Sequence, residues 1–184
     1  MTTVVPPKEK SATALIVPAL IGCAVSAAIG AYAGAHHPAG VAVNVAGFGS
    51  PSTVKAWLTT AAIVLAIIQL LSALVMYGKL KVPNDAYVPA LHRWSGRVAF
   101  ILTVPVAMHC LYAFGFQTVD TRVLIHSTLG TLFFGAFTVK MLVLTRKGLP
   151  GWALPLLGGI VFTILAALFV TSSLWFFANF GVSR

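Results

Sequence analysis

The chain has 184 residues, of which 59% are hydrophobic and only 8% are charged. A soluble globular domain carries about 25% charged residues, so this composition excludes an ordinary soluble protein and predicts an integral membrane protein. The formal net charge is +9. Because the basic residues stand in short segments beside apolar runs, topology and anionic lipid head groups account for this charge, and we expect a lipid bilayer and no nucleic acid as partner.

Five apolar runs divide the chain, and each reaches the roughly 20 residues that a helix needs to cross a bilayer. Their apolar residues are continuous and do not alternate with polar ones, which favours helices over a β-barrel. The runs cover residues 11–33, 57–78, 88–116, 123–145 and 152–180. The sequence thus predicts an all-α, multi-pass membrane protein of the bacterial plasma membrane, with one transmembrane domain over residues 1–184.

The first run, 11–33, is followed by small residues of the kind found at signal-peptide cleavage sites. We interpret the run as an anchor helix, since it remains part of the chain. An outer loop rich in Gly, Ala, Pro and Ser comes next, at 36–54. It contains His36 and His37, which we interpret as solvated loop residues, with metal ligation in place of another histidine as the alternative.

Orientation follows from the distribution of Lys and Arg. A cytoplasmic N-terminus satisfies the positive-inside rule, because most basic residues then lie on the inner side. The inner residues are Lys8, Lys10, Lys79, Lys81, Arg93, Arg97, Lys140, Arg146 and Lys147, and the outer ones are Lys55, Arg122 and Arg184. We therefore expect the N-terminus in the cytoplasm.

Short loops follow the third and fourth runs, so we expect helices two to five to be consecutive antiparallel neighbours. They would form a four-helix core with the first helix alongside. Neither Asp nor Glu occurs within an apolar run, which disfavours a proton-coupled transporter. Cys23 and Cys110 do fall within apolar runs, and we interpret both as small core residues.

Three histidines belong to the third and fourth runs. His92 and His109 share one helix but are separated by about 25 Å along its axis, so they occupy opposite leaflets. His109 and His126, near the outer ends of consecutive helices, differ in depth by only about 5 Å. Pro105 lies one turn before His109 and should bend the helix there. The outer pair is therefore able to face one site.

Two neutral imidazoles on facing helices suit axial ligation of a haem iron, so we expect His109 and His126 to hold haem b. Gly130 lies one turn after His126, and Gly96 one turn after His92. Such a glycine either clears space for a macrocycle or allows close packing of helices. The alternative for each histidine is a hydrogen bond that only holds helices together.

His92 stands at the cytoplasmic rim between apolar residues and the basic residues Arg93 and Arg97. We expect these three residues to bind lipid head groups, a quinone carbonyl or an acidic partner, or to anchor the helix at the interface. Met76 and Met141 lie at a similar depth, so a second, His/Met haem site is a further alternative.

The chain resembles an actinobacterial family of small multi-pass membrane proteins of unknown function, over roughly residues 57–177. The matching segments are Leu91–Arg97, His109, Ile125–Ser127, Lys140 and Leu149–Trp152. More loosely, it is similar to cytochrome b561-like and ferric-reductase-like transmembrane b-type cytochromes, in which helix-borne histidines hold haem. Those bundles usually contain two histidine pairs, and this chain supplies one, which implies a single haem.

The segment His92–Gly96 also resembles the His-Arg-x-Ser/Thr-Gly segment of succinate dehydrogenase membrane anchors. In those anchors the segment lies near a quinone site. The resemblance implies a quinone-binding role for His92, Arg93 and Ser95.

The leading functional hypothesis is a membrane b-type cytochrome that passes single electrons to or from a partner oxidoreductase, a respiratory complex or the quinone pool. Because the chain shows no flavin or nicotinamide domain, we expect an electron-transfer subunit and not a complete enzyme. The alternative hypothesis is a cofactor-free accessory or assembly subunit of a larger membrane complex, with structural histidines.

Overall fold

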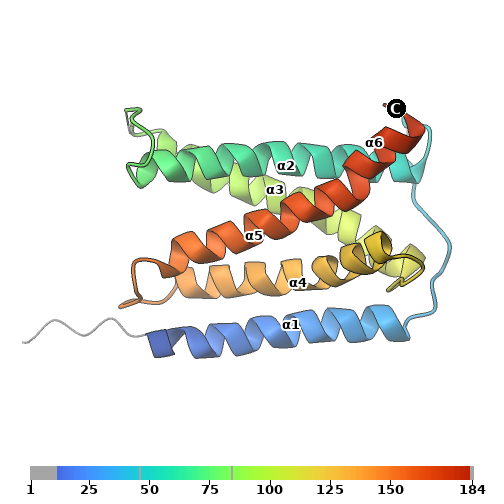
Figure 1. The fold of residues 1–184 in the computed structure, drawn as a ribbon, viewed down its shortest axis with the longest axis horizontal. Coiled ribbons are helices and arrows are strands. Elements are labelled where there is room, and N and C mark those ends of the chain that lie inside the picture. The colour runs from blue at the N-terminus through green and yellow to red at the C-terminus, as the bar shows by residue number, and fades with distance from the viewer. Residues whose placement is uncertain (1–11, 46, 84, 183–184) are drawn as a thin grey trace, which may run out of the picture.

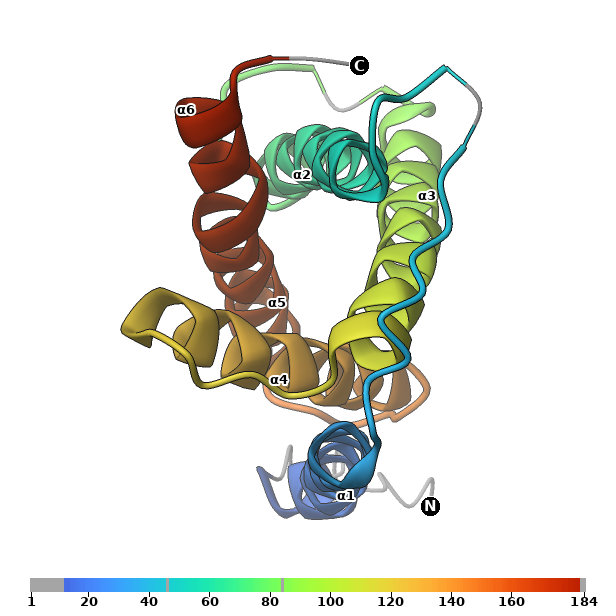
Figure 2. The ribbon, with the colours of Figure 1, turned by 90° about the vertical axis from the view of Figure 1, so that its right-hand side faces the viewer.

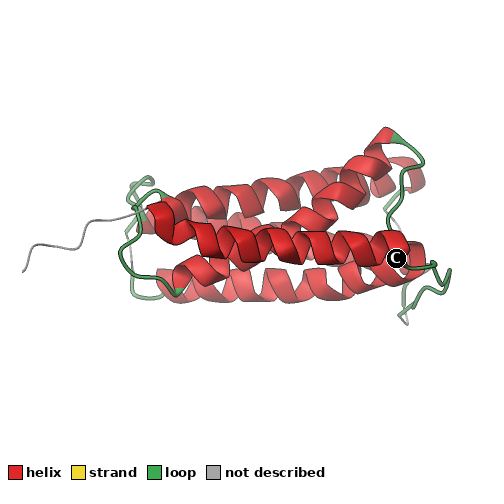
Figure 3. Ribbon diagram, turned by 90° about the horizontal axis from the view of Figure 1, so that it is seen from below, coloured by secondary structure: helices red, strands yellow, loops and turns green. Residues whose placement is uncertain are grey.

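The computed structural model describes residues 12–45, 47–83 and 85–182, which are helical apart from their connecting loops (Figure 3). The elements are η1 (Ala12–Leu15), α1 (Ile16–Ala35), α2 (Pro51–Met76), α3 (Val88–His109), η2 (Cys110–Phe114), α4 (Thr121–Leu144), α5 (Ala153–Phe169), η3 (Val170–Leu174) and α6 (Trp175–Phe180). The segments η2 and η3 are π-helical and continue α3 and α5 without a break.

The expected number of membrane-spanning helices is confirmed. Five helical spans in the described part of the chain are long and apolar enough to cross a membrane: Ala12–Ala35, Pro51–Met76, Val88–Phe114, Thr121–Leu144 and Ala153–Phe180. The predicted start of the first helix at Ser11 lies outside the described residues, as do Lys8, Lys10 and Arg184.

The second helix begins six residues earlier than predicted, at Pro51 and not at Trp57, and ends at Met76. The outer loop is correspondingly shorter than the predicted 36–54. Ser50 caps the helix by accepting a hydrogen bond from the Thr53 backbone N–H at 3.2 Å, and proline suits the first helical position because it lacks an N–H. The six additional residues place Lys55 within the helix.

The helices run alongside one another, and α2, α3, α4 and α5 form the predicted four-helix core (Figure 1). An end-on view shows these four as a ring, with α1 outside it against α4 (Figure 2). A buried cluster joins three of the four helices, α2, α4 and α5. Its members are Ile63, Ala66, Phe133, Val161 and Leu165.

The contact between α1 and α4 depends on two glycines. A Cβ on Gly22 would lie 2.7 Å from the Gly135 carbonyl oxygen, and one on Gly135 would collide with Ser26 and with the Gly22 carbonyl. Small residues of this kind allow helix backbones to approach closely in a bilayer. Many other α1 side chains face outwards, among them Cys23, so its interpretation as a core residue is wrong.

The two π-helical segments lie at the same end of the bundle, where α3 passes into α4; we call it the α3–α4 end. A π-helical turn widens the backbone and occurs frequently at functional sites. At η2 the loop after α1 binds the backbone: the Ala39 and Gly40 N–H groups donate to the carbonyls of Tyr112 and Ala113, at 3.0 and 3.2 Å.

A candidate cofactor-binding cavity

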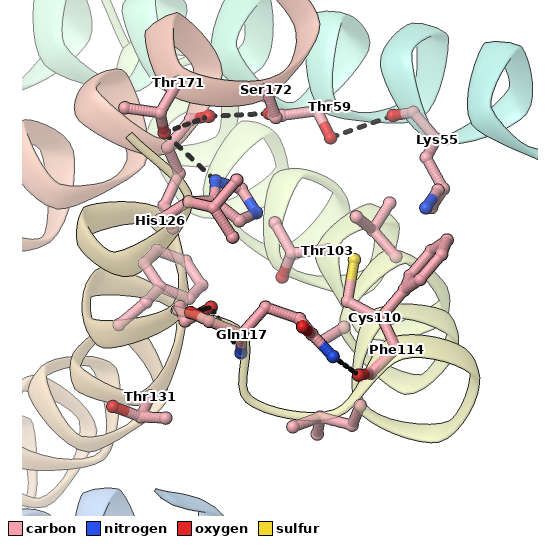
Figure 4. Close-up of a pocket in the computed structure, with 18 of the residues that line it drawn as sticks. Lys55, Thr59, Thr103, Cys110, Phe114, Gln117, His126, Thr131, Thr171 and Ser172 are labelled. Atoms are coloured by element: carbon pink, nitrogen blue, oxygen red, sulfur yellow. Dashed lines mark hydrogen bonds between the residues drawn. The ribbon is translucent and has the colours of Figure 1, made fainter. Parts of the chain in front are cut away.

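A cavity of about 560 Å³ lies at the α3–α4 end, between α2, α3, α4 and the last span (Figure 4). Both π-helical segments contribute to its wall, η2 through Cys110 and Phe114 and η3 through Thr171, Ser172 and Ser173. The volume falls within the range of small-molecule and cofactor sites, about 300–1,000 Å³. Most of the remaining wall is apolar.

His126 reaches the cavity from the second turn of α4. Asp120 fixes the start of that helix by accepting a hydrogen bond from the Val123 N–H at 2.8 Å. The His126 side chain points between the helices, and one of its ring nitrogens faces the open space (Figure 4).

The tautomer of His126 follows from its neighbour. His126 Nδ1 lies 3.0 Å from Thr171 Oγ1, and that hydroxyl donates its proton to the Ala167 carbonyl at 2.8 Å. When the hydroxyl donates to that carbonyl, it accepts from His126, and Nδ1 carries the donating hydrogen. In this tautomer the lone pair of Nε2 is uncommitted, on the side of the ring that faces the cavity.

The two glycines singled out in the sequence have different surroundings. Gly130 lines the cavity, and a Cβ added to it would meet no heavy atom within 4 Å. Gly96 lies outside the cavity, against the side chain of Gln69, where a Cβ would come within 2.7 Å of Cδ. Thus Gly130 borders open space beside His126, and Gly96 allows α2 and α3 to pack closely.

His109 lies at the same end of the bundle but is not one of the residues that line the cavity. Its ring stacks on Phe114, a residue of the wall, at 6.1 Å between centroids. In the described part of the chain, the buried Nε2 of His109 has no hydrogen-bond partner. The structure thus brings His109 next to the wall and His126 onto it, with different contacts for each.

His92 lies at the opposite end and binds α2. Its Nδ1 is 3.0 Å from the Gln69 carbonyl and 3.1 Å from Ser72 Oγ. Arg93 is exposed, and the Arg97 guanidinium lies 5.2 Å from the centre of the Trp94 ring. His92 therefore joins α3 to α2, and its quinone role stays a prediction.

The loop histidines are also placed. His36 stacks between the rings of Tyr32 and Tyr112, and its Nε2 lies 3.2 Å from the Tyr112 carbonyl oxygen. His37 is exposed. The interactions of His36 attach the loop to η2.

Among the cavity-wall residues that sequence reasoning missed are Lys55, Cys110, Arg122, Thr171 and Ser173. Arg122 donates to the Thr171 carbonyl at 2.8 Å and lies 3.8 Å from the centre of the Trp175 ring. The helix-start signal at Ser50 and Pro51 would have placed Lys55 inside α2. Nothing local in the sequence marks Cys110, the first residue of a π-helical segment, as a wall residue.

Comparison with known proteins identifies a family for the chain. No curated protein and no solved structure matches the chain. A family model described as a family of unknown function (DUF6529) matches residues 15–184. The expected membership of a family of unknown function is thereby confirmed, and the actinobacterial origin and the looser resemblance to b-type cytochromes stay expectations. The chain belongs to the DUF6529 family of unknown function.

Proposed function

We propose that this protein is a membrane b-type cytochrome that holds one haem b in the cavity at the α3–α4 end. The observation that carries the proposal is the position of His126, whose Nδ1 lies 3.0 Å from Thr171 Oγ1 while the ring borders a largely apolar space of about 560 Å³. A haem bound there would supply reversible one-electron transfer.

The surroundings of His126 suit a metal ligand. Ligating histidines almost always donate their other ring N–H to an oxygen, which orients the ring and raises the basicity of the ligating nitrogen. Thr171 Oγ1 is such an oxygen, at 3.0 Å. Gly130, one turn further along α4, leaves the adjoining space open.

His109 is the proposed second ligand. Its buried Nε2 has no hydrogen-bond partner among the described residues, and an unpaired polar atom in a bilayer is costly. Because His109 stacks on Phe114 and does not line the cavity, its ligation requires the wall to rearrange. We therefore expect His126 to be the indispensable ligand and His109 the exchangeable one.

In the membrane, we place the N-terminus in the cytoplasm on the positive-inside rule, which puts the cavity in the outer leaflet of a bacterial plasma membrane. Electrons would pass to or from a membrane oxidoreductase, respiratory subunits or quinone. The bilayer itself is the partner that the five apolar spans support directly.

The test is a dithionite-reduced minus oxidised absorption spectrum of the purified protein. We expect a Soret shift and a sharp α-band, both lost in His126→Ala. His109→Ala should keep haem with an altered spectrum, as expected from replacement of one axial ligand. A wild-type protein that shows neither band after reconstitution with haem would instead support the cofactor-free accessory subunit.

A further inference from the structure

Lys55 is the second polar feature of the cavity. It extends from α2 into the space that His126 borders (Figure 4). Its Nζ lies 4.3 Å from the centre of the Phe114 ring. Within the described part of the chain, the Lys55 ammonium has neither a hydrogen bond nor an ion pair. A partly buried ammonium in a membrane helix is costly unless it is paired, and an aromatic face compensates it only in part.

The rest of the wall does not balance this charge. Among the described residues that line the cavity, none is Asp or Glu. The other strong cation, Arg122, is already engaged by Asp120 at 3.7 Å and by the Thr171 carbonyl. In addition, Ser173 lines the cavity at 1% exposure, and its Oγ has no partner among the described residues. The wall thus offers an unpaired cation and an unpaired hydroxyl.

We propose that the cavity takes an acidic amphipathic ligand, whose carboxylate or phosphate pairs with Lys55 while its apolar body fills the space between the helices. Haem, which carries two carboxylates, is one such ligand. The inference rests on the proposed function only in that case. An anionic lipid offers the same chemistry. Charge-assisted hydrogen bonds of this kind are among the strong ones in proteins.

Metal-free protoporphyrin separates this inference from iron ligation, because it keeps the carboxylates and lacks the metal. We would measure its fluorescence on titration with the full-length protein in neutral detergent, beside its dimethyl ester, which has no charge. We expect the acid to bind roughly 10- to 100-fold more tightly than the ester. Lys55→Met should remove that difference, and Lys55→Arg should retain it.

The matched control is Lys140→Met. Lys140 is another membrane-helix lysine, on α4, and it does not line the cavity. It should leave the preference for the acid unchanged. Circular dichroism of all variants confirms that they are folded. Acid and ester binding equally to the wild type, no binding of the acid at all, or a full preference in Lys55→Met would overturn the inference.

Competition identifies the source of the acidic group. Displacement of protoporphyrin by phosphatidylglycerol, but not by phosphatidylcholine, supports the inference with a lipid as ligand. Failure of both lipids to displace it supports the inference with a tetrapyrrole as ligand.

The same measurements distinguish a failure of the proposed function from a failure of this inference. If iron protoporphyrin binds no more tightly than the metal-free form and His126→Ala leaves both affinities unchanged, the proposal of haem ligation is wrong and the proposal that Lys55 binds an acidic ligand stands. If iron protoporphyrin binds through His126 and its affinity does not depend on Lys55, the proposal of haem ligation stands and the proposal that Lys55 binds an acidic ligand is wrong.

Discussion

At the scale of single residues, the hydrogen bond between His126 and Thr171 decides what the cavity is able to bind. Thr171 lies 45 residues after His126 in the chain, and its hydroxyl is already a donor to Ala167. While it donates there, its role toward His126 is that of acceptor. In this arrangement the hydroxyl holds the imidazole against the wall in the tautomer that leaves Nε2 available to a ligand.

Replacing Thr171 with Val removes the acceptor and keeps the shape of the side chain. We expect haem affinity to fall by about 10- to 100-fold, the usual cost of losing the partner of a ligating histidine. Thr138→Val is the matched control, because the Thr138 hydroxyl donates to the Phe134 carbonyl and its side chain does not line the cavity. The measurement is haem titration followed at the Soret band. Equal affinity of Thr171→Val and the wild type would show that the hydrogen bond does not orient the ligand.

A substitution at Gly130 tests whether haem occupies the open space beside His126. Gly130→Leu should fill part of the cavity and reduce haem binding at least tenfold, whereas Gly158→Leu, in α5, should have no effect. Both glycines have no heavy atom within 4 Å of an added Cβ, and leucine is favoured over glycine in a helix by roughly 0.8 kcal/mol. Thermal unfolding should therefore show no loss of stability in either variant. Unchanged haem binding in folded Gly130→Leu would place the haem elsewhere.

At the scale of elements, α1 depends on a single close approach. The helix lies outside the ring of four and packs on α4 where Gly22 meets Gly135 (Figure 2). It contributes only Ile29 and Ala33 to the cavity wall. Docking of α1 and binding in the cavity are thus largely separable.

The Gly22→Ile substitution should weaken the docking of α1 and leave binding in the cavity unchanged. The added side chain collides with the α4 backbone, and overpacking of this kind costs about 1–3 kcal/mol. We expect a lower thermal midpoint and increased proteolysis after α1, with haem binding retained. Gly34→Ile, in the same helix, is the control, since a Cβ on Gly34 has no heavy atom within 4 Å. Equal midpoints for the two variants would contradict the close contact.

The π-helical segments explain why the site could be predicted only in part. The lengths of the apolar runs were sufficient to predict five spans, and short loops were sufficient to predict the four-helix core. Pro105 predicted a bend near the end of α3, but neither Cys110–Phe114 nor Val170–Leu174 contains a local signal for a π turn. Cys110 and Thr171 lie in these turns and line the wall, so the residues that complete the site were not apparent from spacing.

At the scale of the whole molecule, the two ends of the bundle have different roles. At one end, His92 joins α3 to α2 through the Gln69 carbonyl and Ser72, and Gly96 accommodates Gln69. At the other, His126, Lys55 and the two π-helical segments surround a cavity. The same residue types, His and Gly one turn apart, thus serve packing at one end and a cavity at the other. Sequence alone left both alternatives open for each pair because the partner residues come from other helices.

The most direct test of the account is a titration of iron protoporphyrin into three purified proteins: wild type, His126→Ala and His92→Ala. We expect saturation at one haem per chain in the wild type and in His92→Ala, since His92 binds α2 and not the cavity. In His92→Ala, loss of the interhelical hydrogen bond should cost only about 0.6–1.7 kcal/mol of stability. His126→Ala should bind iron protoporphyrin no more tightly than the metal-free form and should lack the Soret shift of the wild type. Wild-type haem affinity and Soret shift in His126→Ala, or their loss in folded His92→Ala, would contradict the assignment of the site.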